Sequence, residues 1–236
     1  MTMAQILFPP KVVPLAPIVG SDLLFPIRRI FCVGRNYKAH AAEMGISVDK
    51  TQESPMYFMK DASAYVPSGS RIPYPPMTRN LHHEIELVLA IGKAGFELRE
   101  QDAWESLYGY AVGLDMTRRD LQQYARRNGQ PWDTGKNYEQ SAVLSSILPQ
   151  AQCGRIEAAR IALSVNGTLR QSANTRDFIW SIPEILADLS RYYHLEPGDL
   201  VYTGTPEGVG PVAAGDTLEG SIEGIGTIRL EVTSSP

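Results

Sequence analysis

The sequence predicts an α+β fold with a mostly β core. Segments with the composition of strands outnumber segments with helical spacing, and the two kinds do not alternate regularly, as they would in a doubly wound sheet. The chain has 236 residues, of which 43% are hydrophobic, which is enough for a substantial core. We find no repeat at a fixed period.

The first 27 residues are rich in proline, which favours extended chain and short edge strands over helix. We therefore predict a small N-terminal extension over residues 1–27, packed on a main domain of residues 28–236. The main domain opens with a short apolar segment, Ile30–Val33, which is predicted to form a buried strand that ends at Gly34.

A short helix is predicted next, with Asn36 as its N-cap and Gly45 at its end. His40 and Glu43 stand three residues apart, so they would lie on one face of this helix within contact range. Residues 46–54 are polar and irregular. A short helix followed by a polar loop is a candidate lid.

Residues 55–75 suggest short strands, and residues 81–92 are predicted to form one longer strand with clear alternation. Glu84 and Glu86 would share one face of it, because successive strand side chains point to opposite faces. Both faces continue with apolar residues, so both are predicted to be buried. Buried carboxylates repel each other, and Mg²⁺, Mn²⁺ or Ca²⁺ would relieve that repulsion. The alternative is a solvated face of an edge strand.

Another strand is predicted over residues 107–114, followed directly by Asp115. Thr117 and Asp120 then resemble a capping box that opens a helix running to about Arg127. Asp115 is a candidate third carboxylate beside Glu84 and Glu86, and three carboxylates suit octahedral Mg²⁺. An ordinary helix-start aspartate is the alternative.

The clearest helix start is at Ser181, with Pro183 just inside the helix and Glu184 at its third position. Apolar residues then follow helical spacing to Tyr193. The tail from Asp199 to Val232 is β-rich and punctuated by glycine. Its turn at 204–210 contains Pro206 and precedes no helix, so it does not match a dinucleotide fingerprint.

Charge and cysteine content exclude several classes of function. The net charge is 22 − 26 = −4, so a basic surface for nucleic acid is not expected. The two cysteines, Cys32 and Cys153, lack the spacing of a zinc site or a disulfide framework. No apolar stretch has the length of a membrane span, and no signal peptide is recognisable, so we expect a cytoplasmic protein without a membrane partner.

Two lysines are candidates for the same site. Lys136 follows Gly135, and Lys60 ends the apolar run 56–60. A solvated lysine is the more common case for either position, so their assignment depends on the rest of the sequence.

Ordered motifs through nearly the whole chain resemble the fumarylacetoacetate hydrolase superfamily, and most closely its acylpyruvase and fumarylpyruvate hydrolase branch. They are Cys32-Val33-Gly34-Arg35-Asn36-Tyr37 with His40 and Glu43, Phe58-Met59-Lys60, His83-Glu84-Ile85-Glu86, Gly113-Leu114-Asp115-Met116-Thr117 with Arg119 and Asp120, Gly135-Lys136, Val165-Asn166-Gly167, Gly198-Asp199, and Thr203-Gly204-Thr205-Pro206 with Gly208-Val209-Gly210.

The resemblance implies a mixed β-sandwich or roll with a few short helices and a lid helix, a homodimer, and Mg²⁺ or Mn²⁺. It implies that Glu84, Glu86 and Asp115 are metal ligands, that His40 and Glu43 activate water, and that Lys136 polarises the substrate. Arg35, Arg119, Gln122 and Thr205 are the implied substrate contacts, and we add Lys60 to them.

The resemblance also implies an enzyme of aromatic catabolism that hydrolyses the carbon–carbon bond of a small 2-oxo acid, an acylpyruvate, with fumarylpyruvate favoured. An oxaloacetate decarboxylase, a 2-oxo-enoate isomerase and a non-catalytic binding protein on the same fold are the alternatives. Two positions depart from the family pattern: Asp61 stands where proline is usual, and Asn137 stands where serine is usual.

Overall fold

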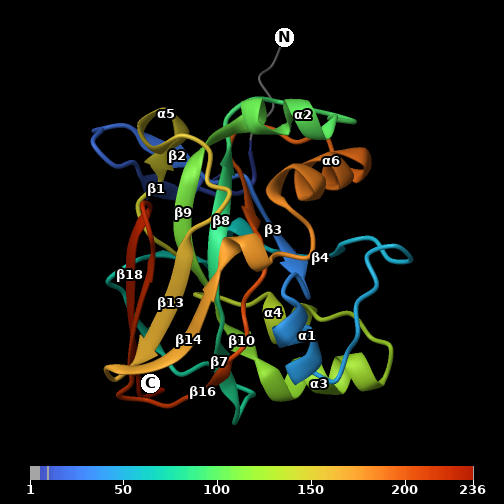
Figure 1. The fold of residues 1–236 in the computed structure, drawn as a ribbon. Helices are drawn as coiled ribbons and strands as arrows, with labels where there is room; N and C mark the ends of the chain where they lie inside the picture. The colour runs from blue at the N-terminus through green and yellow to red at the C-terminus, as the bar shows by residue number, and fades with distance from the viewer. Residues whose placement is uncertain (1–5, 10, 236) are drawn as a thin grey trace.

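The computed structural model describes residues 6–9 and 11–235, and its fold is mostly β with short helices, as predicted (Figure 1). Within these residues an eight-stranded and a five-stranded sheet make up most of the fold, and a three-stranded sheet and a two-stranded hairpin complete it. The mixture of several sheets with short helices between them confirms the α+β class.

The larger sheets are built from strands far apart in the sequence. The eight-stranded sheet has the order β4-β3-β15-β8-β9-β11-β5, with β12 also paired to β9, and the five-stranded sheet has the order β14-β13-β17-β18-β6. The strands of the first sheet are β3 (Arg29–Gly34), β4 (Met56–Lys60), β5 (Tyr65–Pro67), β8 (Ile85–Ile91), β9 (Leu107–Asp115), β11 (Ala142–Leu144), β12 (Leu148–Pro149) and β15 (Asp199–Tyr202). Those of the second are β6 (Arg71–Pro73), β13 (Arg160–Val165), β14 (Thr168–Asn174), β17 (Thr217–Ile222) and β18 (Gly226–Thr233).

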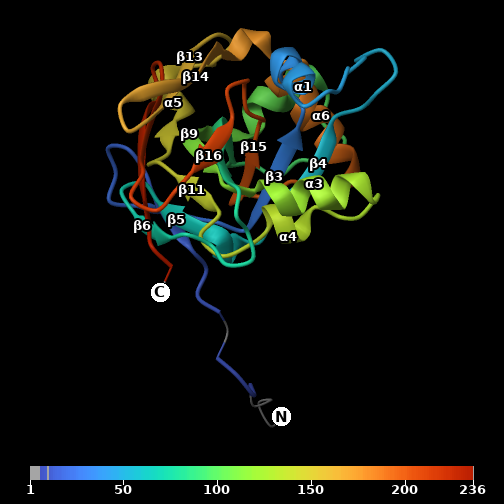
Figure 2. The same cartoon turned by 90° about the horizontal axis from the view of Figure 1, so that it is seen from below.

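The remaining elements are short. The three-stranded sheet consists of β7 (Leu81–His83), β10 (Thr117–Arg118) and β16 (Gly210–Val212), and the hairpin of β1 (Leu15–Pro17) and β2 (Leu24–Pro26). The α-helices are α1 (Lys38–Glu43), α2 (Glu100–Ala103), α3 (Arg119–Arg127), α4 (Asp133–Lys136), α5 (Gln150–Cys153) and α6 (Ile182–Tyr192), and 3₁₀ turns cover Ala62–Ala64, Trp104–Ser106 and Thr175–Asp177. Helices α1, α3 and α4 lie on the same side of the molecule in two perpendicular views (Figures 1 and 2).

Strand β8 is buried on both faces, as its alternation predicts. Leu87 and Leu89 join the larger core, which also contains residues of the five-stranded sheet and of α6. Val88 and Ala90 join a smaller core, where they are clustered with Phe25 of the β1–β2 hairpin. Each fully buried aliphatic side chain stabilises the fold by about 1.5–3 kcal/mol, so β8 is a rigid support for whatever it carries.

The prediction of one continuous strand over residues 81–92 is wrong at Glu84. The strand ends at His83 and a new one begins at Ile85, and the two belong to different sheets. The interruption has a physical cause: β7 pairs with β10 and β16, whereas β8 pairs with β9 and β15. Glu84 therefore lies at the junction of two sheets, where the Asp115 N–H donates to its carbonyl oxygen at 2.9 Å.

Two predicted helix caps are also wrong. Helix α1 begins one residue after Tyr37, and the side chain of Asn36 instead bonds the backbone of Trp180 and Thr203 inside the core. Thr117 lies in β10 rather than at a cap, and α3 starts at Arg119. The Asn36 side chain is captured by backbone groups distant in sequence, and Thr117 is held by the pairing of β10 with His82 of β7.

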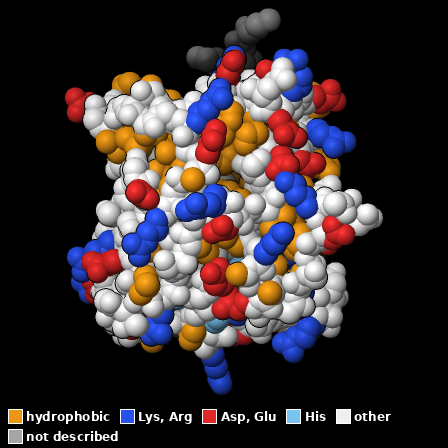
Figure 3. Space-filling model, in the orientation of Figure 1, with side chains coloured by type: hydrophobic (Ala, Val, Ile, Leu, Met, Phe, Trp, Pro, Cys, Tyr) orange, Lys and Arg blue, Asp and Glu red, His pale blue; other side chains and the backbone are white. Residues whose placement is uncertain are grey.

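The predicted start of the helix at Ser181 is confirmed. Ser181 is the N-cap of α6, and the Glu184 carboxylate accepts hydrogen bonds of 2.8 Å from both the backbone N–H and the hydroxyl of Ser181. None of the helices in the described residues is long and apolar enough to cross a membrane. Positive and negative side chains are interspersed on the face shown in Figure 3.

Candidate active site

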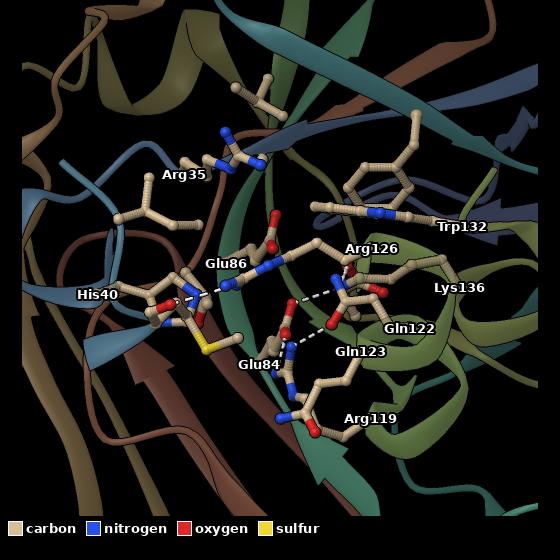
Figure 4. A pocket seen from close by; sticks show the side chains of 17 residues that line it. Arg35, His40, Glu84, Glu86, Arg119, Gln122, Gln123, Arg126, Trp132 and Lys136 are labelled. Carbon is tan, nitrogen blue, oxygen red and sulfur yellow. Dashed lines mark hydrogen bonds and ion pairs between the residues drawn. The ribbon is translucent and has the colours of Figure 1, made fainter. Parts of the chain in front are cut away.

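One cavity brings together most of the residues singled out in the sequence (Figure 4). Its lining comes from the turn after β3, from α1, from the junction of β7 and β8, from the end of β9, and from α3 and α4. The lining residues are Val33, Gly34, Arg35, His40, Met44, Ile46, Phe58, Glu84, Glu86, Asp115, Arg119, Gln122, Gln123, Arg126, Trp132, Lys136 and Thr205.

A cluster of three carboxylates lies in this cavity. Glu84, Glu86 and Asp115 each offer an oxygen within 4.8 Å of the others, and all three side chains are buried. The cluster forms because β8 and β9 are antiparallel neighbours, so that the start of one lies beside the end of the other. The three residues predicted as metal ligands are therefore brought together.

The charges of these carboxylates are not balanced evenly. Burial alone would raise the pKa of Glu84, but the Lys136 ammonium and the Arg119 guanidinium hold it below its ordinary value. Burial, with Asp115 and Glu84 nearby, raises the pKa of Glu86 well above its ordinary value. The contact that the structure gives the Glu86 carboxylate is with the Gly204 N–H, at 2.8 Å.

Lys136 lies between two of the carboxylates. Its Nζ is 2.6 Å from Glu84 Oε2 and 2.5 Å from Asp115 Oδ2, and it also donates to the Thr117 hydroxyl. Burial alone would lower the pKa of Lys136, but the two carboxylates raise it above its ordinary value. The side chain is therefore a cation at the base of the cavity.

Arg119 is held by several acceptors. It forms a buried ion pair with Glu84, and it donates to Gln122 Oε1 and to His82 Nδ1. Burial and then the charge of Arg119 lower the pKa of His82 to about 4, so His82 accepts from Arg119 as a neutral ring. Arg119 and Gln122 line the cavity as a connected pair.

Lys60 is close to this site but does not line the cavity. Its side chain is buried, with Nζ 2.8 Å from Asp115 Oδ1 and bonded to the Lys136 carbonyl and the Ser141 hydroxyl. This geometry places Lys60 against Asp115, on the side away from the residues that line the cavity. The structure therefore shows Lys60 supporting that carboxylate, and a substrate contact at Lys60 stays a prediction.

His40 and Glu43 form the pair that their spacing predicts. His40 Nδ1 is 3.2 Å from Glu43 Oε2, and the other Glu43 oxygen accepts from the Gly208 N–H at 3.3 Å. His40 lines the cavity, whereas Glu43 lines a neighbouring outer depression. Burial lowers the pKa of His40, although Glu84 and the Glu43 hydrogen bond act in the opposite direction. His40 is therefore neutral and able to accept a proton at neutral pH.

Arg35 and Thr205 also line the cavity. Arg35 has a φ of 62°, a backbone conformation that costs a non-glycine residue energy, and its guanidinium lies 6.0 Å from the Trp132 ring centroid. The Thr205 hydroxyl donates to the Ile85 carbonyl and accepts from Gln171, which ties the 204–210 turn to β8.

Some residues of the cavity had no signal in the sequence. Gln123 and Arg126 lie on a polar helix, where such residues are ordinarily solvated, and Phe58, Trp132 and Ile46 supply apolar wall. Only the packing of α3 against the chain after α1 places Arg126 at the cavity.

The donor set fits a hard divalent cation. Three carboxylate oxygens within 4.8 Å suit Mg²⁺ or Mn²⁺ better than zinc, which prefers nitrogen and sulfur. The observation that carries the fit is Glu86: it has no cationic side-chain partner among the described residues, and its two neighbours are carboxylates. A bound cation would supply the missing charge.

Fold and site together define an enzyme with a buried carboxylate cluster suited to a divalent cation and a neutral histidine in the same cavity, and the chain belongs to the fumarylacetoacetate hydrolase family. Residues 29–233 match the family described as "Fumarylacetoacetate (FAA) hydrolase C-terminal". The match covers most of the chain, including all eleven residues predicted for the site.

Named relatives fall in several branches of the family. The chain is 57% identical over 189 residues to a fumarylpyruvate hydrolase of a Ralstonia species, covering 80% of this chain and 98% of that protein. It is 41% identical to the mitochondrial oxaloacetate tautomerase of Mus musculus, covering 88% of this chain and 93% of the relative. A crystal structure of fumarylpyruvate hydrolase from Pseudomonas aeruginosa, in complex with Mn²⁺ and pyruvate, has a TM-score of 0.93 and 47% identity, and covers 98% of this chain and 100% of that one.

Proposed function

We propose that the protein is a divalent-metal-dependent hydrolase that cleaves fumarylpyruvate to fumarate and pyruvate. One observation carries the proposal: the carboxylate cluster, the His40–Glu43 pair and the Lys136 ammonium all meet at one cavity. The 57% identity to a fumarylpyruvate hydrolase supports this choice of acyl group.

Glu84, Glu86 and Asp115 would hold Mg²⁺ or Mn²⁺, which would supply Lewis acidity toward the oxygens of a 2-oxo acid. His40 acts as the general base. The Glu43 carboxylate accepts from Nδ1–H and orients the ring, which leaves the other ring nitrogen to take a proton from water. The hydroxide so formed attacks the acyl carbonyl, and the bond between that carbon and the pyruvyl methylene breaks.

The electrons of the broken bond pass to the pyruvyl part, where negative charge develops on the 2-oxo oxygen. Lys136 is a buried cation at the cavity base and is positioned to stabilise that charge. The proton that His40 took from water then becomes available to the pyruvyl methylene, so His40 returns to its neutral form. Arg35, Arg119, Gln122 and Thr205 are proposed to contact the substrate.

The test uses three substrates. Purified protein with Mg²⁺, and separately with Mn²⁺, is incubated with fumarylpyruvate, acetylpyruvate or oxaloacetate, and pyruvate and the co-product are quantified. We expect pyruvate and fumarate in equal amounts, and no product after chelation. Absence of cleavage of both acylpyruvates would refute the proposal.

Two variants separate the roles of the site residues. Glu84→Ala should lose both metal binding, measured by calorimetry, and turnover. His40→Ala should retain metal binding but lose turnover by about 10²–10⁴-fold, the usual contribution of a general base. A fully active His40→Ala enzyme would refute the base role while leaving the metal site intact.

A second candidate is an activity on oxaloacetate, and the 41% identity to an oxaloacetate tautomerase favours it. Oxaloacetate is also a 2-oxo acid, and loss of its far carboxylate or movement of its proton develops charge at the same 2-oxo oxygen. Neither reaction needs an attacking water. Pyruvate and CO₂ from oxaloacetate, or enol formation measured by ultraviolet absorbance, with no cleavage of acylpyruvates, would support this candidate instead.

We also propose a cytoplasmic homodimer that acts in aromatic catabolism. Exposed apolar side chains on and before the β1–β2 hairpin, including Val13, Leu15, Leu23 and Leu24, support a protein partner at that face. Sedimentation of the wild type should give a dimer mass, and Leu15→Asp with Leu24→Asp should weaken it. A monomer at micromolar concentration would refute the dimer.

A further inference from the structure

Four cationic side chains line the cavity, and two of them have no carboxylate partner among the described residues. Lys136 and Arg119 form ion pairs with Glu84. Arg35 and Arg126 form none in the part of the chain that the structure describes. A negatively charged group of a ligand would therefore find its free partners in Arg35 and Arg126.

These two arginines differ in the surfaces that they border. Arg35 lines only the inner cavity that contains the carboxylates. Arg126 lines the same cavity and also borders a shallow outer depression, which contains none of the three carboxylates. Met44 and Gln123 also line both the inner cavity and the outer depression. Arg126 therefore lies at the boundary between the two.

The guanidinium of Arg126 is directed across this opening. Its Nη1 donates to the Met44 carbonyl, just after α1, at 3.2 Å, and Figure 4 shows the side chain reaching across the cavity from α3 toward the segment that carries His40. That contact uses one of five N–H groups. Within residues 6–9 and 11–235 the remaining donors have no side-chain acceptor, so they can bind a carboxylate. Glu43, the acidic residue of the outer depression, is already bonded to His40 and Gly208.

We propose that Arg126 binds the carboxylate at the far end of the acyl group and so determines a preference for acylpyruvates that end in a carboxylate. This inference rests on the proposed function. The 2-oxo acid end of such a substrate faces the cation site, and a trans double bond in the acyl group keeps the second carboxylate away from it. Next to the Met44 side chain at this end of the cavity, that carboxylate loses part of its water and needs a cation as its partner.

Binding at Arg126 also connects the substrate to the general base. The carboxylate would bond to α3 through Arg126 while Arg126 still bonds to the end of α1, which carries His40. A methyl-ended acyl group makes no such connection. Loss of Arg126 should therefore mainly raise KM for acylpyruvates that end in a carboxylate. It should lower kcat for them by a smaller factor.

The experiment compares two substrates in four proteins. The wild type, Arg126→Gln, Arg126→Lys and the matched control Arg127→Gln are assayed with fumarylpyruvate and acetylpyruvate at saturating Mg²⁺. Arg127 is the neighbouring exposed arginine, and its Nε donates to the Gln123 carbonyl of its own helix. Arg126→Gln should lower kcat/KM for fumarylpyruvate by about 10- to 100-fold, the range for a lost charge-assisted hydrogen bond, and at least tenfold more than for acetylpyruvate.

Arg126→Lys should recover part of this loss, because it keeps the charge without the planar fork. Arg127→Gln should leave the ratio of the two substrates unchanged. An equal loss for both substrates would mean that Arg126 only holds α1 in place, and an unchanged kcat/KM for both substrates in Arg126→Gln would mean that another group binds the far carboxylate. Either result overturns the inference.

A binding measurement separates this inference from the proposed function. Fumarate and crotonate, which differ in the second carboxylate, are titrated into the Mg²⁺-loaded wild type and Arg126→Gln by calorimetry. The inference expects fumarate to bind more tightly than crotonate only when Arg126 is present, whether or not any acylpyruvate is cleaved. If the wild type does not prefer fumarate, or if Arg126→Gln keeps the preference, the inference fails even if fumarylpyruvate is hydrolysed.

Discussion

His40 combines a buried position with a carboxylate partner, and the two act on its pKa in opposite directions. Burial lowers the pKa, and the Glu43 hydrogen bond raises it, with burial prevailing. The neutral ring, which is the base form, therefore persists below the ordinary histidine pKa of about 6.5. Loss of activity on acidification should begin below that pH.

This gives a prediction for the pH profile of kcat/KM, which reports the free enzyme. The acid limb should lie below pH ~6.5 in the wild type. In Glu43→Gln it should move to still lower pH, because a group that raises the pKa is removed, and the plateau rate should fall. Glu53→Gln, on the exposed loop after α1, is the charge-matched control. If the acid limb does not move in Glu43→Gln, then Glu43 does not affect the pKa of the catalytic group, and its proposed coupling to His40 is refuted.

At the scale of single residues, the sequence predicted well which side chains gather at the site. It predicted less well which partner each of them contacts there. The spacing of His40 and Glu43 sufficed for their contact, because one turn of helix fixes it. Lys60 and Lys136 were both suspected, but only the packed structure places one behind Asp115 and the other in the cavity. Such a difference depends on strands that are distant in sequence.

At the scale of elements, the two departures from the family pattern contact each other. The Asp61 N–H donates to Asn137 Oδ1 at 2.8 Å, and the Asp61 side chain accepts from the Ser63 N–H at the start of a 3₁₀ turn. The hydrogen bond joins the residue after Lys60 to the residue after Lys136. Proline at position 61 would lack the N–H, and serine at position 137 would lack the amide, so each departure accounts for the other.

A double-mutant cycle tests this pairing. Asn137→Ser should cost about 0.5–1.5 kcal/mol of unfolding free energy in the wild type, the net value of one hydrogen bond, and close to nothing in Asp61→Pro. Urea unfolding of the four proteins measures the coupling. The Asp61 φ of −64° already suits proline, so backbone strain does not enter the comparison. An equal cost in both backgrounds would show that the two residues are independent.

Strands and helices were predicted correctly where the local sequence pattern determines the structure. They were missed where pairing or packing with distant segments determines it. Alternation identified β8 and its two buried faces, and the serine–proline–glutamate start identified α6. The break at Glu84 was missed because the strands on each side pair with different sheets. The position of Arg126 at the cavity was missed because a polar helix face gives no sign of what packs beside it.

At the scale of the whole molecule, metal binding should stabilise the fold. A ligand at 100 times its Kd adds about 2.7 kcal/mol to the unfolding free energy, which for a chain of this size raises Tm by about 5–10 °C. We expect such a rise with Mg²⁺ or Mn²⁺ over a chelated sample in differential scanning fluorimetry.

Glu86→Gln gives the sharpest control for this effect. Burial beside two carboxylates raises the pKa of Glu86, so a neutral amide of the same shape should not destabilise the chelated protein. The same substitution removes a cation ligand, so the metal-induced rise in Tm should disappear. Glu231→Gln, in an exposed ion pair with Arg71, should keep the full rise. If the metal raises the Tm of Glu86→Gln as much as that of the wild type, the metal does not bind at Glu86.

The residues of the cavity stand on two kinds of segment: the strand ends near the junction of β7 and β8 at Glu84, and the helices and loops around them. The carboxylates stand on strand ends that are fixed by two sheets, whereas much of the remaining cavity lining comes from α1, α3, α4 and the loops between them. Substitutions on those peripheral segments can therefore change which 2-oxo acid is accepted without disturbing the cation site. Descendants of one ancestral chain could diverge toward hydrolase, tautomerase or isomerase activity in this way, and the relatives of this protein carry all three names.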